Sequence, residues 1–432
     1  MATPHTVQSD APDGLRGAST AVNFTLSDEL RELVQEVRSF VRDDVRPADA
    51  AVGGDDRIEA RWEVVDELRG IARDRGIFAP HLPPAWGGLG VGVLGMALIS
   101  QECGESMLAS LALNAMAPDE GNMHTLLHAA TPTQLEQFLL PLAEGRARSC
   151  FAMTEPGVAS SDPTNLTTAA VRDGDHWVLN GRKWFTTGAR GATFAIVVAR
   201  TGRDELPARS RYSLFLVPTD TPGWKVVRDP GILGAHYVGG HPEVALEDVH
   251  VPAENLLGDE GAGFAISQVR LAGGRLAHAM RWIGAAQLAL DLMTRRLHER
   301  EAFGRRLADH QAMQWFIADS ATDLYASRVM VLHAAWKVEN GLPHREEVSM
   351  VKTFVSEAFG RVVDRAVQVF GADGIADDLP IERLYRDARA ARIYDGASEV
   401  HRMVIARSLL RLARDGGSTR SACGDLLERA GR

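Results

Sequence analysis

The sequence predicts an α+β protein in three parts: an N-terminal α-helical domain, a central small antiparallel β-barrel domain and a C-terminal four-helix bundle. Three observations predict this class. Hydrophobic residues recur at helical spacing in the first third, short β-rich runs separated by turns fill the middle, and longer helical patterns return after Gly263. Because the middle runs follow one another without intervening helices, a small antiparallel barrel or sandwich is expected there.

Composition limits the classes of function. The 432 residues are 45% hydrophobic and 24% charged, which is typical of a globular protein with two or three domains. The 57 acidic residues outnumber the 47 basic ones and give a net charge of −10, which argues against nucleic acid or an anionic membrane as partner. Three widely spaced cysteines indicate a reducing compartment. No run of roughly 18 apolar residues occurs, so we expect a cytoplasmic protein without a membrane span.

The first third should be helical. Residues 1–22 are rich in Ala, Ser, Pro and Gly and are expected to be a disordered leader, so the helical domain is placed at residues 23–149. Ser27 can cap a helix with an acidic first turn, and Pro47 is expected to end that helix. Further helical patterns cover residues 60–75, 95–106 and 133–142.

The middle part, residues 150–262, should be built of short strands. Two β-rich runs flank Asp173-Gly174-Asp175, which predicts a hairpin. Further β-rich runs lie at residues 195–200, 213–217, 225–227 and 244–251. Beyond them, three long helical patterns and a last helix near 398–413 predict the bundle at residues 263–414, followed by a flexible tail at 415–432.

Two stretches of the β-domain have the composition of ligand-binding segments. Met153–Asp162 combines hydroxyl and small residues next to a strand, so its backbone could bond a planar heterocycle or a phosphate. In isolation, a tight interdomain turn is the commoner reading. Lys183–Gly188 places aromatic side chains beside hydroxyls on one strand, which suits stacking on a ring. A half-buried strand is again the commoner reading.

A third stretch, Tyr394–Glu399, leads into the last helix. Asp395 either caps that helix, a common role for aspartate, or serves as a base in a cleft between domains. The glycine-containing loop at residues 368–374 follows a long helix and could be only its C-cap. No metal-binding or P-loop pattern occurs and the histidines lack ligand spacing, so metal and nucleoside-triphosphate chemistry have no support.

In this order, the pieces resemble the acyl-CoA dehydrogenase family of FAD flavoproteins, and the acyl-CoA dehydrogenase fold is therefore expected. The resemblance covers about residues 24–414. It includes Met153-Thr154-Glu155-Pro156, the run Arg300–Leu307 with Gln311, the loop 368–374 and Ile393-Tyr394-Asp395-Gly396. The runs 117–123 and 395–402 resemble a branch that has aspartate where most relatives have glutamate.

The resemblance implies FAD-dependent α,β-dehydrogenation of an acyl-CoA thioester. Asp395 matches the catalytic acid and would take the α-proton while the β-hydrogen leaves as hydride to flavin N5. The α-proton is weakly acidic, so charge on the carbonyl oxygen must be stabilised, in the family by the backbone N–H of this residue and a ribityl hydroxyl. Burial against flavin and acyl chain is expected to raise the pKa of Asp395 and to strengthen it as a base. Gly274 matches the position of the base in some other relatives and has no side chain.

The resemblance also assigns contacts to the flavin and the substrate. Met153 and Thr154 should meet the pyrimidine edge of the flavin. Phe185 stands where a stacking tryptophan is usual, and Thr187 should bond N5. Ser161 matches a residue that touches both FAD and the pantetheine arm. The other substrate-binding positions are Arg275, Tyr394 and Gly396.

A second subunit is implied for the rest of the cofactor. Its adenosine and pyrophosphate would be held by the neighbouring subunit's residues at the positions of Arg300, Phe303, Gln311 and Gln368. The remaining cofactor positions are Ala372 and Glu399, of which Glu399 replaces a glutamine. We therefore expect a homo-oligomer, a dimer of dimers, with an electron-transfer flavoprotein as electron acceptor.

Two alternatives stay open. One is a flavin oxidase or nitroalkane-oxidase-like member of the same fold, which also uses an aspartate base. The other is a DNA-associated flavoprotein of the alkylation response, which the net charge of −10 disfavours.

Overall fold

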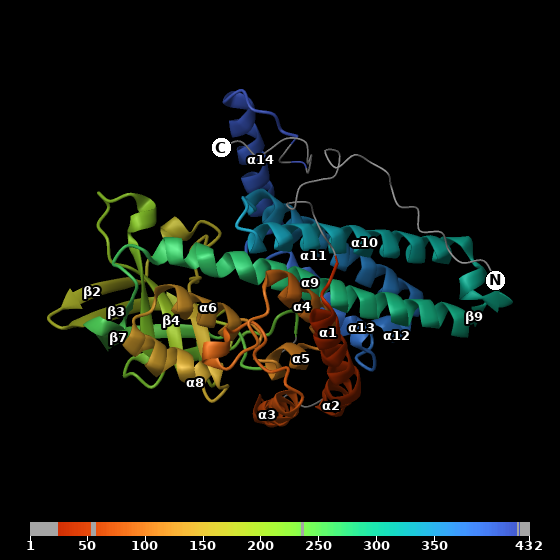
Figure 1. The fold of residues 1–432 in the computed structure, drawn as a ribbon, viewed down its shortest axis with the longest axis horizontal. Coiled ribbons are helices and arrows are strands. Elements are labelled where there is room, and N and C mark those ends of the chain that lie inside the picture. The colour runs from red at the N-terminus through yellow and green to blue at the C-terminus, as the bar shows by residue number, and fades with distance from the viewer. Residues whose placement is uncertain (1–24, 53–57, 235–236, 421–422, 424–432) are drawn as a thin grey trace.

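The computed structural model describes residues 25–52, 58–234, 237–420 and Cys423. Figure 1 shows three long helices side by side, α9 (Gly263–Glu299), α10 (Gln311–Glu339) and α11 (Arg345–Phe370), with the large sheet near one end. The expected leader lies outside the described residues, as do residues 421–422 and 424–432 of the expected tail. No helix within the described ranges has both the length and the apolarity needed to cross a bilayer.

The first helix begins where the sequence predicts but does not end there. Ser27 Oγ accepts a hydrogen bond from Leu30 N (3.2 Å) and caps α1 (Asp28–Phe40). The expectation that Pro47 ends this helix is wrong. One π-helical turn, Val41–Val45, shifts the hydrogen-bond register, so Pro47 falls in the first turn of α2 (Arg46–Val52), where a missing N–H costs little.

The rest of the N-terminal part is helical as predicted. Its elements are α3 (Ile58–Asp74), η3 (Pro84–Trp86), α4 (Val93–Glu102), η4 (Cys103–Glu105), α5 (Met107–Ala112), α6 (Asp119–Ala129), α7 (Pro132–Gln134), η5 (Leu135–Leu139) and α8 (Leu140–Ala143).

The described part of the middle region forms an eight-stranded sheet with the order β6-β7-β3-β2-β4-β5-β8, and β1 pairs with β4. The strands are β1 (Ser149–Ala152), β2 (Ala169–Asp173), β3 (His176–Lys183), β4 (Phe194–Arg200), β5 (Tyr212–Pro218), β6 (Trp224–Arg228), β7 (Glu243–Pro252) and β8 (Leu256–Leu257). Short turns η6 (Pro163–Asn165), η7 (Ala208–Ser210) and η8 (Ala253–Asn255) connect some of them. The predicted hairpin is confirmed, because Asp173 pairs with His176.

The sheet is mostly antiparallel, but β4 has parallel neighbours in β1 and β2. Parallel pairing is typical of strands that are buried on both faces. Alternate residues of β4 and β5 belong to two different hydrophobic clusters, one under the helices α6 and α8 and one against β3 and β7. Burial on both faces also explains why these strands have continuous apolar sequences.

The C-terminal part packs α9, α10, α11 and α13 (Pro380–Ala391) around one apolar core. Its smaller elements are β9 (Glu301–Ala302), β10 (Arg305–Arg306), η9 (Leu307–Asp309) and α12 (Ala372–Ile375), and α14 (Ser398–Arg414) projects from the body in Figure 1. The predicted fold class is confirmed by this arrangement, whereas the domain limits stay predictions.

Helix α9 joins the three parts. It packs on α4 and α6 of the N-terminal part, on β5 and on α10 and α11. The contact with the N-terminal part depends on glycines, because a Cβ at Gly284 would lie 1.9 Å from Gln101 O and one at Gly104 2.2 Å from Arg281 O. This close packing places the first half of α9 between the sheet and the segment that precedes α14.

Candidate active site

A cavity of about 2020 Å³ lies where the three parts meet. Its walls come from the loop after β1, the segment after β3, the first half of α9 and the turn before α14. Nine of the predicted site residues line it: Met153, Thr154, Ser161, Phe185, Thr187, Arg275, Tyr394, Asp395 and Gly396. The three stretches selected from the sequence therefore share one surface.

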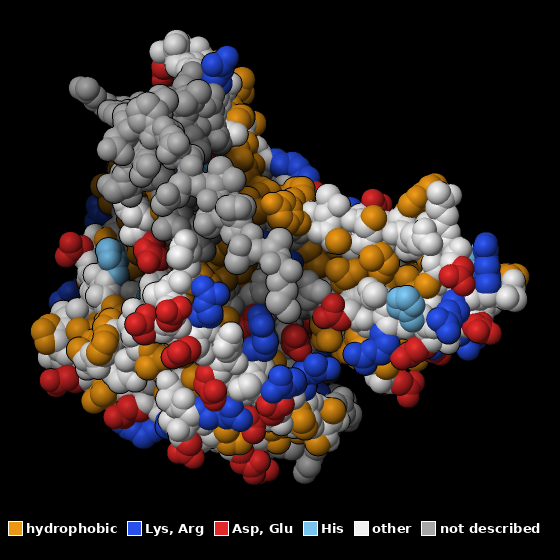
Figure 2. Space-filling model, turned by 45° about the vertical axis from the view of Figure 1, so that its right-hand side comes forward, with side chains coloured by type: hydrophobic (Ala, Val, Ile, Leu, Met, Phe, Trp, Pro, Cys, Tyr) orange, Lys and Arg blue, Asp and Glu red, His pale blue; other side chains and the backbone are white. Residues whose placement is uncertain are grey.

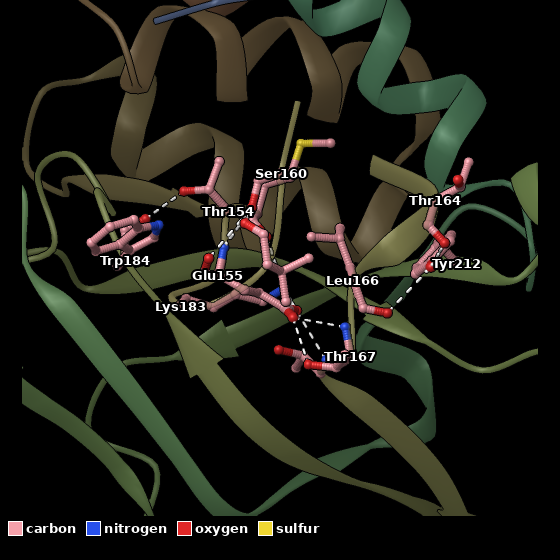
Figure 3. A network of polar contacts seen from close by, with 12 residues as sticks. Thr154, Glu155, Ser160, Thr164, Leu166, Thr167, Lys183, Trp184 and Tyr212 are labelled. Atoms are coloured by element: carbon pink, nitrogen blue, oxygen red, sulfur yellow. Dashed lines mark hydrogen bonds and ion pairs between the residues drawn. The ribbon is translucent and has the colours of Figure 1, made fainter. Parts of the chain in front are cut away.

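The loop after β1 is fixed by a buried ion pair, which Figure 3 shows from close by. Lys183 Nζ donates to Glu155 Oε1 (2.8 Å) and to Met153 O (2.9 Å). The other donors to the Glu155 carboxylate are Thr167 N (2.7 Å), Thr167 Oγ1 (2.7 Å) and Thr168 N (2.9 Å). Burial alone would raise the pKa of Glu155, but Lys183 and the threonine donors outweigh burial and lower it. Glu155 is therefore a structural carboxylate that holds the loop against the sheet.

The second stretch lies just beyond a strand rather than on it. β3 ends at Lys183. The next residue is tied to the loop after β1, because Thr154 Oγ1 in that loop donates to Trp184 O (2.6 Å). Phe185 has φ +47°, a conformation that bulky residues rarely adopt, and its side chain is 44% exposed beside the cavity. Thr187 Oγ1 lies 2.9 Å from His241 Nδ1. The expectation of a half-buried strand at these positions is wrong, because the chain turns away at the cavity wall.

Asp395 lies in a turn between α13 and α14. The N-cap of α14 is Ala397, so the reading of Asp395 as the helix cap is wrong. Asp395 itself has φ +54°, a left-handed conformation that aspartate tolerates better than most residues. Its carbonyl oxygen accepts from Arg275 Nε (3.1 Å) and from His401 Nε2 (3.2 Å), which hold the turn against two helices.

The start of this turn is tied to the bundle by Lys352. The buried Lys352 Nζ donates to Ala391 O (2.8 Å), at the end of α13, where a helix leaves its carbonyls unpaired. Burial lowers the pKa of Lys352 to about 8, and the nearby negative charge of Asp395 partly offsets that effect. Lys352 is thus a buried basic group that supports the segment carrying Asp395.

The Asp395 carboxylate faces the cavity with its side chain 24% exposed. Oδ2 lies 3.1 Å from His278 Nε2. Burial alone would raise the pKa of Asp395, but the His278 imidazole and the guanidinium groups of Arg270 and Arg275 outweigh burial and hold it below its ordinary value. In the chain alone the donors and cations thus outweigh burial, whereas the raised pKa expected from burial against flavin and acyl chain stays a prediction.

Two residues of the site were missed at the level of sequence. Arg270 is a buried cation, whose pKa burial lowers to about 10. Its Nε donates to Asn122 Oδ1 (2.9 Å) and its guanidinium stacks 4.0 Å over the Phe151 ring. His278 lies four residues after Gly274 and three after Arg275, hence on the same face of α9. That spacing was the available signal for His278, whereas nothing in the sequence placed Arg270 beside Asn122.

The remaining predicted cofactor residues do not line this cavity. They are Arg300, Phe303, Gln311, Gln368, Ala372 and Glu399, and all are exposed, Phe303 by 97%. An ion pair of 2.6 Å between Arg296 and Asp373 brings the end of α9 against α12, so the segments around Arg300 and Gln368 share one end of the bundle. Within the described residues, no group of three or more acidic, histidine or cysteine side chains is placed to hold a metal ion.

Comparison with known proteins agrees with this geometry. Models of the acyl-CoA dehydrogenase N-terminal, middle and C-terminal domains match residues 27–146, 150–249 and 261–410. The chain is 44% identical over 352 residues to probable acyl-CoA dehydrogenase FadE2 of Mycobacterium tuberculosis, which covers 80% of this chain and 86% of that protein.

Two further relatives extend the comparison. Acyl-CoA dehydrogenase family member 11 of Gallus gallus is 36% identical over 399 residues, 89% of this chain but 51% of that protein, so the chain spans about half the length of that relative. The solved butyryl-CoA dehydrogenase of Megasphaera elsdenii matches with a TM-score of 0.79 and 30% identity, over 90% of this chain and 100% of that one. The three domain models and these identities show that the chain belongs to the acyl-CoA dehydrogenase family.

Proposed function

We propose that Asp395 is the base with which this acyl-CoA dehydrogenase removes the α-proton of an acyl-CoA thioester. The observation that carries the proposal is the bonding of its carboxylate. His278 lies at Oδ2, whereas no hydrogen bond or ion pair from a described residue reaches Oδ1, and the side chain lines the cavity. A carboxylate with one oxygen held and one free can accept a proton without breaking its support.

The residues at the cavity fit FAD, the cofactor of this family. The loop 153–161 offers hydroxyl and backbone groups, and Phe185 presents an exposed ring in a strained conformation that costs of order 1 kcal/mol. Backbone strain of this kind clusters at active sites and ligand-binding sites. We propose Met153, Thr154, Ser161, Phe185 and Thr187 as flavin contacts. When bound, FAD supplies the acceptor for the β-hydrogen and its electron pair.

The chain's own groups prepare the α-proton for transfer. Arg275 and His401 fix the Asp395 carbonyl, so the carboxylate and the neighbouring N–H keep one position. No acceptor among the described residues takes the Asp395 N–H, which leaves it available for charge that develops on a thioester oxygen. Gly274 lines the cavity with its backbone alone, and nothing lies within 4 Å of a Cβ built there, so the space beside it is open. Arg275, Tyr394 and Gly396 are proposed to contact the substrate.

The second subunit is part of the proposal. Figure 2 shows hydrophobic side chains along the projecting arm of the molecule. Helix α10 also exposes large hydrophobic side chains, namely Trp315, Tyr325 and Val329. A dimer of dimers would cover such a surface and bring Arg300, Phe303, Gln311 and Gln368 to a neighbour's cofactor. Glu399 and Ala372 stay proposed cofactor contacts. An electron-transfer flavoprotein as acceptor, a cytoplasmic location and the domain limits stay predictions.

Anaerobic titration of the purified yellow holoprotein with a panel of acyl-CoA thioesters tests the function. We expect loss of flavin absorbance with at least one thioester, and no comparable loss with the free acids. A colourless protein that does not take up FAD, or a flavin that no thioester bleaches, contradicts the proposal. Rapid reoxidation by oxygen with substrate bound would instead identify a flavin oxidase.

A further inference from the structure

We propose that His278 is a positioning residue for Asp395: its Nε2–H holds Oδ2, so that Oδ1 alone is presented to the α-carbon. This inference rests on the proposed role of Asp395 as base. His278 Nε2 lies 3.1 Å from Asp395 Oδ2, and both side chains are mostly buried, with 13% and 24% of their surface exposed.

The tautomer of His278 follows from its other neighbour. Arg281 Nη2 lies 3.0 Å from His278 Nδ1. A guanidinium can only donate, so Nδ1 must accept and the ring proton must lie on Nε2, the nitrogen that faces Asp395. Arg281 is itself buried, 7% exposed, and cannot swing into solvent. Arg281 and His278 thus form a directional chain of donors that ends on one carboxylate oxygen.

The ring is held on its faces as well. His278 stacks on Trp282, one helical turn along α9, with centroids 6.0 Å apart and planes 18° apart. It meets Tyr394 at 5.3 Å and 64°, and Trp282 Nε1 donates to Tyr394 OH (2.8 Å). Tyr394 precedes Asp395 in the chain, so the same cluster restrains the ring and the backbone of the base. A ring packed in this way cannot flip to exchange its two nitrogens.

Holding one oxygen determines where the proton goes. In the α-proton transfer, the C–H bond breaks, its electron pair stays with the substrate, and the proton forms a new O–H bond. The Nε2–H occupies one lone pair of Oδ2, whereas no described residue bonds Oδ1, so Oδ1 is the oxygen open to the substrate and accepts the proton. His278 takes no proton itself. An aspartate is one methylene shorter than glutamate, so its reach depends more on the orientation of the carboxylate.

Several charged groups face Asp395, and the experiment must separate His278 from them. They are Arg270 and Arg275 on α9, Lys352 on α11 and His401 on α14, and Glu399 on α14 interacts with Lys352. Substitution of His278 leaves all of these in place. His278→Gln keeps an N–H donor near the position of Nε2, and His278→Ala removes it. His298→Ala is the matched control, because His298 is an exposed histidine at the far end of the same helix.

Two CoA thioesters separate proton removal from complete oxidation. Octanoyl-CoA reports the full reductive reaction through flavin bleaching. 3-Thiaoctanoyl-CoA has sulfur in place of the β-carbon and cannot lose a hydride, so only α-deprotonation occurs, seen as a long-wavelength charge-transfer band against FAD. For His278→Ala we expect bleaching about 10- to 100-fold slower at pH 7, with less than about threefold change in the substrate dissociation constant.

The pH dependence gives a signature that loss of packing alone would not. Removing a donor to a carboxylate raises the pKa of that carboxylate. The acidic limb of the pH profile of the charge-transfer band should therefore move up by about one to two pH units in His278→Ala. His278→Gln should restore most of the bleaching rate and return the acidic limb most of the way to its wild-type pH. His298→Ala should match wild type in both measurements. Equal rates and equal acidic limbs in wild type and His278→Ala would overturn the inference.

A substrate-free measurement keeps the inference separate from the proposed function. Crystal structures of wild type and His278→Ala holoprotein would show the Asp395 carboxylate directly. We expect it to rotate or to occupy more than one orientation in the variant, and an unchanged single orientation would overturn the inference. If no thioester affects the wild-type flavin, the proposed function fails, while the orientation of Asp395 still decides the role of His278.

Discussion

Glu155, buried in the loop after β1, and Asp395, on the wall of the cavity, are two carboxylates each beside a basic residue, and they differ in how many of their oxygens are bonded. Both oxygens of Glu155 are bonded, by Lys183 and by three donors on Thr167 and Thr168, and its side chain is 2% exposed. Asp395 has one oxygen beside His278, and its side chain is 24% exposed on the cavity.

The difference separates a structural carboxylate from the one that we propose as the base. In both residues, donors and cations outweigh burial and lower the pKa, so the direction of the pKa shift does not distinguish them. What distinguishes them is the oxygen of Asp395 that no described residue bonds. A fully bonded carboxylate has no room for a substrate proton, whereas a half-bonded one has both support and a free oxygen.

Asp395→Asn should show the largest effect. The amide keeps the size of the side chain but cannot accept the α-proton, so flavin bleaching by acyl-CoA should slow by about 10⁴-fold, the upper range for a positioned base. Stopped-flow absorbance under anaerobic conditions measures this rate, and FAD content and urea stability should stay near wild type.

Glu120 is the alternative candidate for the catalytic base. Glu120 also lines the cavity, is buried, and has an Oε2 with no hydrogen-bond partner among the described residues. If Glu120→Gln abolished bleaching while Asp395→Asn retained it, the base would be Glu120, and the free oxygen of Asp395 would have no catalytic meaning.

Glu155→Gln should affect stability. It leaves the buried Lys183 cation without its counter-ion, so we expect the free energy of unfolding to fall by about 3–5 kcal/mol. Urea unfolding followed by circular dichroism measures this change. The double variant Glu155→Gln with Lys183→Met should recover much of the loss, since no unpaired charge remains. Equal stability of the single variant and wild type would show that the pair does not hold the loop.

The pH dependence of unfolding should separate the pair from other carboxylates. The pKa of Glu155 is lowered in the folded state, so its contribution is present above the unfolded pKa of about 4.3 and is lost as pH falls towards the folded pKa. Between pH 6 and pH 3, wild type should therefore lose about 1–3 kcal/mol more than the double variant. Parallel loss in the two proteins, measured as urea midpoints, would contradict this assignment.

Thr167→Val should give the smallest effect. It removes the Thr167 hydroxyl bond to Glu155 Oε2 but keeps the Thr167 N–H and the other donors. Because Thr167 is exposed and water can replace the hydroxyl, we expect a loss of only about 1 kcal/mol in urea unfolding. Flavin bleaching should be unchanged, and a slowed reaction would show that the loop and Asp395 are coupled.

Local patterns were sufficient for the elements of the fold. The acidic first turn after Ser27, the turn Asp173-Gly174-Asp175 and the return of helical spacing after Gly263 each describe contacts within a few residues, and all three predictions are confirmed. Pro47 was misjudged because a π-helical turn, which sequence spacing does not reveal, lets the chain continue as helix.

The candidate site shows the limit of local patterns. Met153, Thr154, Phe185 and Asp395 each lie in a recognisable run of the sequence, and the structure places all four at one cavity. The exposed positions Arg300, Phe303 and Gln368 are not at this cavity in the single chain, and their role stays a prediction about a second subunit.

The sequence by itself determined the three-part α+β architecture, the family resemblance and the position of a short acid before the last helix. Only the tertiary structure decided the protonation environment of that acid. Most cations and donors around Asp395 come from α9 and α11, which are far from Asp395 in the chain, and electrostatic and hydrogen-bond energies depend on distances in space. For that reason the sequence did not predict the lowered pKa of Asp395 in the chain alone, and the contact of His278 with Asp395 became visible only when α9 was packed against the turn that carries Asp395.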